Sequence, residues 1–376
     1  MTRERLLSDV CSHITYGVTT AAVDKENGPR LLRITDLTDA GVDWHKVPGC
    51  DISENEAAKY KLLDGDIVIA RTGGTVGKSY LIKDPPVAVY ASYLLRLRAN
   101  QSNILPDYLD LFFGSNAYWS QLNKAAQGAA QPNVNASTLA KLVLTVPQIN
   151  DQRHIAARLK AHLAEVEKVR QAVKEQLSEA SKLADVIIFD SLNKNNVENH
   201  ALGDVLEEVK WGIGKDWAKY PVLGATREGL APAKEPPGKK PERYKPAFPG
   251  TVFYNPMRIL IGSIAFVDDD DEPGITSPDY VVLKGRDGLV DSRWFYYWLR
   301  STLGKQCINS LARGAVRERM LFNRLAEGKI ELPNYDIQRK ASKALTELKP
   351  LRMAIEKKLS EINLLPGEIL SQAFRI

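Results

Sequence analysis

An internal repeat limits what this chain can fold into more than any other feature of the sequence. Segment 314–326 repeats segment 128–140 at a spacing of 186 positions, and matching residues continue on both sides. The further matches, at this or a similar spacing, are Leu7-Ser-Asp-Val10 with Leu202-Gly-Asp-Val205, Tyr16-Gly17 with Trp211-Gly212, Gly65 with Gly250, Gly77 with Gly262, Pro147 with Pro333, and Gln152-Arg153 with Gln338-Arg339. Such a repeat predicts two copies of one unit. We expect each copy to be a globular part followed by a long helix.

Each copy ends in a segment with a heptad pattern. From Asp151 to about Leu192, apolar or small residues recur at steps of four and three, at Leu159, Leu163, Val166, Val173, Leu177, Ala180, Ala184 and Ile187. The second copy has the matching series Leu345, Leu348, Ile355, Leu359, Ile362 and Ile369, and Arg170 and Arg352 occupy equivalent seam positions. These seams are typical of a coiled coil. We expect an antiparallel pair because each helix must return to its own globular part; two helices packed on separate cores are the alternative. Pro366 predicts a kink or an end in the second helix.

The globular parts mix strand and helix patterns, which predicts an α+β fold of two α/β domains alternating with the two long helices. Strand candidates in the first copy are Leu31–Thr35, Asp66–Ala70, Tyr80–Ile82 and Val87–Leu97. Residues 106–124 form an amphipathic helical pattern with several aromatic residues, and residues 294–299 take the matching place in the second copy. Aromatic residues at helical spacing are more typical of a core than of a platform for stacking bases.

The stretch Arg71-Thr-Gly-Gly-Thr-Val-Gly-Lys-Ser79 resembles the end of a phosphate-binding P-loop. A P-loop needs its first glycine five positions before Gly77, where this chain has Thr72, and a helix must follow the loop. Here a short β-type run follows and prolines stop it. The second copy has Pro256-Met-Arg-Ile-Leu-Ile-Gly262 at this place and lacks Gly-Lys-Ser. We therefore expect a glycine-containing turn between two strands.

The bulk composition suits a globular chain and excludes few functions. The net charge of +5 permits a nucleic-acid partner without requiring one. The longest apolar run, Ile259–Val267, is too short to span a membrane, and the first residues lack an apolar signal core. Three widely spaced cysteines predict reduced thiols in the cytoplasm. The five histidines show no metal-ligand spacing, so we expect no metal and no cofactor.

Several of these features resemble one known family. The block 65–78, the Pro…Gln-Arg junctions that open both long helices, and the plan of two globular parts alternating with two helices resemble the specificity subunits of type I restriction–modification systems. The resemblance covers essentially the whole chain. It implies target-recognition domains at 1–150 and 195–336, a central long helix at 151–194 and a C-terminal long helix at 337–376.

The resemblance also implies a function. Each recognition domain would read one half of a bipartite double-stranded DNA target, and the helices would set the spacing and dock two adenine-methyltransferase subunits. Motor–nuclease subunits would join the complex, and the chain itself would be non-catalytic. A helix of about 42 residues spans roughly 60 Å, on the order of one and a half to two turns of B-DNA.

Base and phosphate contacts require Arg, Lys, Asn and Gln side chains on loops. The candidates in corresponding loops are Arg33, Arg71, Lys78, Gln131, Asn133, Lys210, Lys215, Arg258, Arg313, Arg317 and Arg319. The basic, proline-broken segment 234–246 is expected to be a mobile loop that drapes on DNA or serves as a linker.

Two other classes of function remain open from the sequence. One is an enzyme that binds nucleotide through the 71–79 loop, or that methylates DNA through Asp84-Pro-Pro-Val87, although this turn lacks the aromatic residue that would stack on a flipped base. The other is a coiled-coil scaffold that binds only proteins. The acidic run Asp268–Glu272 is expected to be a solvated hairpin tip rather than a metal site.

Overall fold

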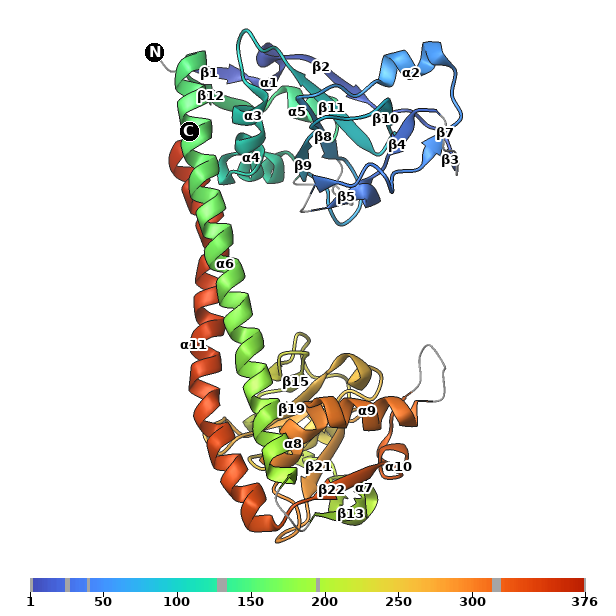
Figure 1. Cartoon of the computed structure of the whole chain (residues 1–376), viewed down its shortest axis with the longest axis vertical. Coiled ribbons are helices and arrows are strands. Elements are labelled where there is room, and N and C mark those ends of the chain that lie inside the picture. Colours follow the sequence, from blue (N-terminus) through green and yellow to red (C-terminus); the bar gives the residue numbers. More distant parts are fainter. Residues whose placement is uncertain are drawn as a thin grey trace. The chain divides into compact units, whose positions relative to one another are not determined.

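The chain divides into two compact units that are best described one at a time. The computed structural model describes residues 3–23, 28–38, 41–126, 134–193, 197–312 and 319–374 (Figure 1). Unit 1 contains Met1–Ala172 and Leu359–Ile376, and unit 2 contains Val173–Lys358. Each long helix therefore contributes one end to each unit. In the described ranges, no helix is both long and apolar enough to cross a membrane.

Unit 1 is built on a four-stranded antiparallel sheet. Its strand order is β2 (Cys11–Tyr16), β11 (Leu94–Ala99), β8 (Asp66–Ala70) and β9 (Ser79–Leu81). A second four-stranded sheet has the order β10 (Ala88–Tyr90), β4 (Arg30–Leu32), β7 (Gly49–Cys50) and β3 (Ala22–Val23). Two-stranded pairs are β1 (Arg3–Leu6) with β12 (Val143–Val146), and β5 (Leu37–Thr38) with β6 (Gly41–Val42).

The helical elements of unit 1 cover these sheets and lead into the first long helix. They are α1 (Leu7–Val10), η1 (Ile34–Asp36), α2 (Glu54–Tyr60), α3 (Pro106–Phe113), α4 (Asn116–Ala126), α5 (Ala136–Ala140) and the beginning of α6 (Ile149–Leu192).

Unit 2 has the same central sheet as unit 1. The order is β14 (Leu206–Glu208), β21 (Val281–Gly285), β18 (Val252–Tyr254) and β19 (Ile264–Phe266). The two-stranded pairs are β13 (Glu198–Ala201) with β22 (Lys329–Leu332), β15 (Leu223–Ala225) with β16 (Leu230–Pro232), and β17 (Lys245–Ala247) with β20 (Gly274–Thr276). The helical elements are α7 (Leu202–Val205), η2 (Gly214–Lys219), η3 (Pro241–Arg243), η4 (Ile259–Ile261), α8 (Ser292–Arg300), α9 (Thr302–Leu311), α10 (Phe322–Leu325) and α11 (Tyr335–Ala373).

The predicted repeat is thus confirmed in the topology. The order β2-β11-β8-β9 in unit 1 corresponds strand for strand to β14-β21-β18-β19 in unit 2, and the pair β1-β12 corresponds to β13-β22. Equivalent backbone hydrogen bonds follow: the Leu7 amide donates to the Leu142 carbonyl (2.8 Å), and the Leu202 amide donates to the Gly328 carbonyl (2.9 Å).

The Pro…Gln motif fastens the start of each long helix to its own unit. Gln152 is fully buried; its Oε1 accepts from the Leu105 amide (2.8 Å), and its Nε2 donates to the carbonyls of Asn103 and Pro147 (both 2.9 Å). We call this arrangement the glutamine clasp. Every partner is a backbone group. These hydrogen bonds satisfy the amide oxygen and nitrogen of the Gln152 side chain, which burial would otherwise leave unpaired.

Gln338 makes the same clasp in unit 2. Its Oε1 accepts from the Asp291 amide (3.0 Å), and its Nε2 donates to the carbonyls of Leu289 (3.0 Å) and Pro333 (2.8 Å). Each of these partners lies 186 positions after its counterpart in unit 1. The Pro…Gln motif therefore recurs in the sequence because its glutamine makes the same three backbone hydrogen bonds in both units.

The long helices are paired antiparallel. In unit 1 the first half of α6 shares a hydrophobic core with the last turns of α11, through Leu159 and Leu370. In unit 2 the last turns of α6 share a core with the start of α11, through Ile188 and Leu345 (Figure 1). Of the two outcomes expected at Pro366, a kink or an end of the helix, the end does not occur, because α11 continues to Ala373. Burial of Leu370 in the core beyond the proline helps to stabilise those last turns.

The helices and strands expected from the sequence differ from those of the structure mainly where tertiary contacts determine their bounds. The single helix expected at 106–124 is two helices, α3 and α4, because Ser115 accepts a hydrogen bond from the Tyr118 amide (3.3 Å) and so caps the second one. The strand expected at Leu31–Thr35 ends at Leu32, where η1 follows, and the run Val87–Leu97 is divided into β10 and β11. The aromatic clusters are core, as expected: Tyr108, Phe112, Tyr118, Trp294 and Phe295 are all at most 1% exposed.

Candidate nucleic-acid interface

In unit 1, Arg71 is the candidate that the fold holds most firmly. It follows β8 directly; its amide donates to the Tyr93 carbonyl, and its carbonyl accepts from the Val134 amide (both 3.1 Å). Its guanidinium carbon lies 4.7 Å from the centre of the Tyr16 ring, and its Nη1 donates to the Ser92 carbonyl (3.5 Å). Stacking on an aromatic ring orients the planar fork and leaves other N–H groups available.

Two exposed tyrosines accompany Arg71, and the sequence reasoning did not select either as a site residue. Tyr16 ends β2, is 40% exposed, and accepts a hydrogen bond from the Ala136 amide through its hydroxyl (3.3 Å). Tyr93 is 61% exposed. The aromatic–glycine pair repeated at Tyr16-Gly17 and Trp211-Gly212 is the signal that could have found the first of them.

Lys78 is exposed on the hairpin between β8 and β9. Gly73 and Gly77 adopt positive φ angles of 81° and 84°, and a Cβ on Gly77 would lie 2.5 Å from Cδ2 of Leu122. Ser79 begins strand β9 rather than a helix. The loop therefore has the turn geometry expected from the sequence and lacks the following helix that a P-loop requires.

Arg33 is tied to its own segment. Its Nε and Nη2 donate to the two carboxylate oxygens of Asp36 at 3.0 and 2.7 Å, and this hydrogen bonding raises the pKa of the guanidinium above its usual value. Arg33 is thus less available for a ligand than Arg71, because Asp36 already neutralises its charge.

At the equivalent corner of unit 2, the arginines come from positions in the sequence that do not correspond to Arg71. The Met320 amide donates to the Pro256 carbonyl (3.0 Å), which corresponds to the bond between Val134 and Arg71 in unit 1. Pro256 therefore takes the place of Arg71. The exposed Arg258 lies two residues beyond it, and Arg319 is the neighbour of Met320. Arg319 makes an exposed ion pair with Asp279 at 3.3 Å.

The two lysines selected in unit 2 flank an exposed tryptophan. Lys210 lies 3.6 Å from Glu208, and Lys215 lies in η2 and is exposed. Between them, Trp211 is 59% exposed. A Cβ on the next residue, Gly212, would lie 2.6 Å from the Glu242 carbonyl oxygen, so only glycine permits this close backbone approach.

Four selected residues, Gln131, Asn133, Arg313 and Arg317, lie outside the described residues. The neighbours Val134 and Arg319 join the corners formed by Arg71 and Pro256. The described residues Val134 and Met320 therefore lie at equivalent corners of the two units.

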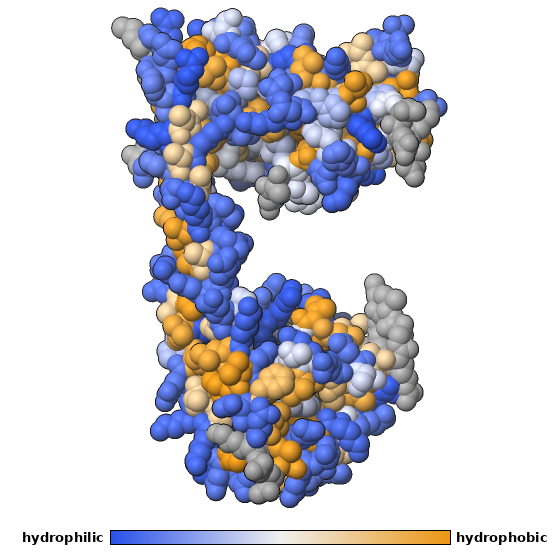
Figure 2. All heavy atoms as spheres, viewed as in Figure 1, coloured by the Kyte–Doolittle hydropathy of each residue, from blue (hydrophilic) through white to orange (hydrophobic). Residues whose placement is uncertain are grey.

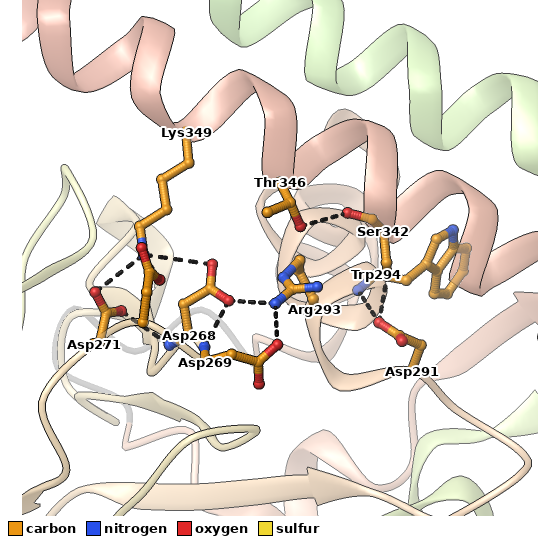
Figure 3. A network of polar contacts seen from close by, with 10 residues as sticks. Asp268, Asp269, Asp271, Asp291, Arg293, Trp294, Ser342, Thr346 and Lys349 are labelled. Atoms are coloured by element: carbon orange, nitrogen blue, oxygen red, sulfur yellow. Dashed lines mark hydrogen bonds and ion pairs between the residues drawn. The ribbon is translucent and has the colours of Figure 1, made fainter.

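The acidic run of unit 2 is only in part the solvated tip that the sequence suggested. Figure 3 shows that Arg293 on α8 pairs with Asp268 and with Asp269 (2.8 Å), and that Lys349 on α11 contacts Asp268 (3.5 Å) and Asp271 (3.0 Å). Lys349 also pairs with Asp270. Asp268 is only 6% exposed. The prediction of a solvated tip fails for Asp268, because Arg293 and Lys349 on two helices contact it, whereas the side chains of Asp269 and Asp270 remain 82% and 75% exposed. We call this network the acidic latch.

The acidic latch shifts the pKa values of its members in the directions that favour ion pairing. Burial alone would raise the pKa of Asp268, but the hydrogen bonds from Arg293 and the Asp269 amide and the nearby cations lower it below its usual value. Burial alone would lower the pKa of Lys349, but its hydrogen bonds to Asp270 and Asp271 and the charge of Asp268 raise it to about 12. The latch thus fastens the loop after β19 to α8 and α11.

The described residues contain no cluster of His, Cys, Asp and Glu that could hold a metal ion. Burial raises the pKa of the Cys11 thiol to about 12 and also raises that of Cys307, which disfavours the reactive thiolates. Instead, the visible faces of both units are largely hydrophilic, with smaller hydrophobic groups (Figure 2). The corner of unit 1 combines the guanidinium of Arg71 with the exposed aromatic side chain of Tyr16, a combination that suits nucleic acids.

Comparisons with known proteins agree with this architecture. Residues 14–177 match the family model described as the type I restriction modification DNA specificity domain. The chain is 23% identical over 377 residues to the protein named as the specificity subunit of type I restriction enzyme MjaX from Methanocaldococcus jannaschii, covering 92% of this chain and 86% of that protein. It is 24% identical over 185 residues to the EcoKI specificity subunit of Escherichia coli, covering 48% of this chain and 40% of that protein.

A solved structure described as the structural basis of complex assembly and conformational transition of the type I R-M system shares the fold. It matches with a TM-score of 0.65 and 19% identity, covering 100% of this chain and 97% of that one. The family model over residues 14–177 and the relatives are thus all of type I restriction–modification DNA specificity proteins, and the solved structure shares the fold of this chain.

Proposed function

We propose that each unit of this chain reads one half of a bipartite target in double-stranded DNA. The observation that carries the proposal is the corner of unit 1, where Arg71 stacks on the exposed Tyr16. Unit 2 repeats the exposed aromatic residue and its close-packed glycine at Trp211-Gly212, and its exposed Arg258 and Arg319 lie beside Pro256 and Met320, the counterparts of Arg71 and Val134. Arginine recognises guanine edges and phosphates through paired N–H groups. Because Arg71 has no arginine counterpart at Pro256, the two units would read different half-targets.

The paired helices would fix the distance between the two half-targets and dock two adenine-methyltransferase subunits. α6 has 44 residues, which corresponds to about 66 Å at 1.5 Å per residue. Motor–nuclease subunits would join this complex. The chain itself would make and break no bonds, and it would work in the cytoplasm, where its thiols stay reduced.

Arginine variants of the two corners provide the test. The chain is co-expressed with its candidate adenine methyltransferase, and modified adenines are mapped across the genome. Arg71→Ala should relax the sequence in one half of the target, and the double variant Arg258→Ala/Arg319→Ala should relax only the other half. Losing a bidentate base contact reduces discrimination by about 1–3 kcal/mol, or roughly ten- to a hundredfold.

Matched variants separate reading from folding. Lys124→Ala, an exposed lysine on α4, should leave the methylated sequence unchanged. Replacing residues 195–336 with the corresponding domain of a relative should change one half-target and keep the other. If either arginine variant altered both halves, or if neither altered the sequence, the assignment of one half-target to each corner would be wrong.

A further inference from the structure

Unit 1 contains a second cationic site outside its recognition corner. A pocket of about 380 Å³ lies between β2, β11 and the end of α2, lined by His13, Thr15, Ala58, Lys59, Lys61, Leu63, Arg96 and Arg98. Thr15 and Tyr16 are successive residues of β2, so their side chains point to opposite faces of the strand. The pocket is therefore distinct from the corner formed by Tyr16 and Arg71. We call it the basic pocket.

Strand pairing builds the floor of the basic pocket. Thr15 lies opposite Arg96, and His13 lies opposite Arg98 in the antiparallel pair of β2 and β11. Directly opposite residues share one face of the sheet. The Arg96 guanidinium donates to the Lys61 carbonyl (2.8 Å) and to the Thr15 hydroxyl (3.3 Å), so it also holds the end of α2 against the sheet.

The cations of the basic pocket exceed its anions. Asp66 is paired with Arg98 through two hydrogen bonds of 2.7 Å. Arg96 is only 5% exposed, yet the hydrogen bonds that the structure gives it are to neutral oxygens. Within the described ranges, the structure pairs neither Lys59 nor Lys61 with a carboxylate. A buried charge without a counter-charge is costly, so the site favours an anion from outside.

The equivalent place in unit 2 already contains an anion. Leu283 corresponds to Leu97 because each pairs with the equivalent residue of the next strand, Val252 or Ile67, so Lys284 corresponds to Arg98. Glu207 lies opposite Lys284 in the pair of β14 and β21, as His13 lies opposite Arg98 in unit 1. Unit 2 therefore has a carboxylate at the position where unit 1 has a histidine.

We infer that the basic pocket of unit 1 binds a phosphate group, from either a nucleic-acid backbone or free phosphate. A phosphate offers several strong acceptors to the lysine ammonium groups, the guanidinium of Arg96 and the hydroxyl of Thr15. This site lies on the opposite face of β2 from the proposed base-reading corner. It would add affinity without sequence discrimination, because phosphate contacts carry no direct base information.

Two variants of the full chain test the basic pocket. Lys59→Ala/Lys61→Ala removes two exposed cations, and His13→Glu introduces the carboxylate that unit 2 has at the equivalent position. Lys124→Ala serves as the control. In the first arm, the unfolding midpoint is measured against the concentration of inorganic phosphate at constant ionic strength. Phosphate should raise the midpoint of the wild type and the control and leave both pocket variants unchanged.

In the second arm, binding to target and non-target duplexes is measured against salt concentration. If the pocket holds a backbone phosphate, the pocket variants should lower the salt slope by roughly 0.9 per lost contact and keep the ratio of target to non-target affinity. A response to inorganic phosphate alone would identify free phosphate as the ligand. Variants that match the wild type in both arms would overturn the inference. The target-to-non-target ratio of the wild type tests the proposed DNA reading separately.

Discussion

The two units place opposite charges at the same point of one fold. In unit 1 the Asp107 carboxylate on α3 contacts Lys160 of α6 and lies 3.8 Å from Lys83 of the loop after β9. In unit 2 the equivalent helix position is Arg293, and the equivalent loop position is Asp268. Lys349 of α11 supplies the second cation. Both units thus fasten a loop to a helix at the same place, with reversed signs.

The glutamine clasps, unlike these reversed charges, are the same in both units. Gln152 and Gln338 bind backbone groups at equivalent positions in both units. A contact to the backbone survives when the neighbouring side chains change, whereas a contact between side chains persists only if both partners change together. The comparison therefore separates what the shared fold requires from what each unit has acquired for itself.

The largest expected effect comes from removing a clasp. Gln152→Ala and Gln338→Ala should each destabilise their own unit by about 3–5 kcal/mol, because each removes a buried amide that makes three hydrogen bonds to the backbone. Denaturant unfolding followed by hydrogen exchange in peptides of each unit measures this cost. The exposed Gln101→Ala is the control. Clearly unequal losses for the two variants would break the equivalence of the clasps.

Glycine substitutions should distinguish the two units at a finer level. Gly77 and Gly262 have φ angles of 84° and 87°, so alanine at either costs about 1–2 kcal/mol in backbone strain. At Gly77 the new Cβ would also lie 2.5 Å from Leu122, whereas at Gly262 the nearest atom is 3.8 Å away. Gly77→Ala should therefore cost about 2 kcal/mol more than Gly262→Ala in thermal unfolding. Equal costs would show that unit 1 absorbs the clash by moving α4.

The smallest expected effect depends on pH. Burial raises the pKa of Asp110 in unit 1 to about 6, against the opposing charge of Lys160, and unit 2 has Tyr296 at this position. Because the folded pKa is raised, the folded state binds the proton more tightly, and stability falls as the pH rises from about 4 to about 6. Asp110→Asn should therefore stabilise unit 1 by about 1–2 kcal/mol at pH 7.5 and have little effect below pH 4.

Unfolding of Asp110→Asn across this pH range, beside a Tyr296→Phe variant of unit 2, checks the sign. The tyrosine variant should show no such dependence between pH 4 and 7.5. A stabilisation by Asp110→Asn that is as large at pH 4 as at pH 7.5 would contradict the raised pKa.

Local patterns predicted the fold well, and long-range partners account for what they missed. β8 has the bounds expected from Asp66–Ala70, and the heptad seams identified both long helices. The break between α3 and α4 depends on a cap at Ser115 and on Gly114, whose missing Cβ leaves room for Leu370, far along the chain. The site was less predictable for a similar reason. Arg33 is neutralised by Asp36, and the stacking of Tyr16 on Arg71 joins strands separated by more than fifty residues.

The reversed charges have a consequence for how the chain avoids misassembly. A chain with two similar bodies risks docking the loop of one against the helix of the other while it folds. Such an exchange would bring Lys83 to Arg293, or Asp268 to Asp107, and like charges at a partly buried contact repel. Mispaired intermediates are therefore penalised, and each loop is directed to the helix of its own copy.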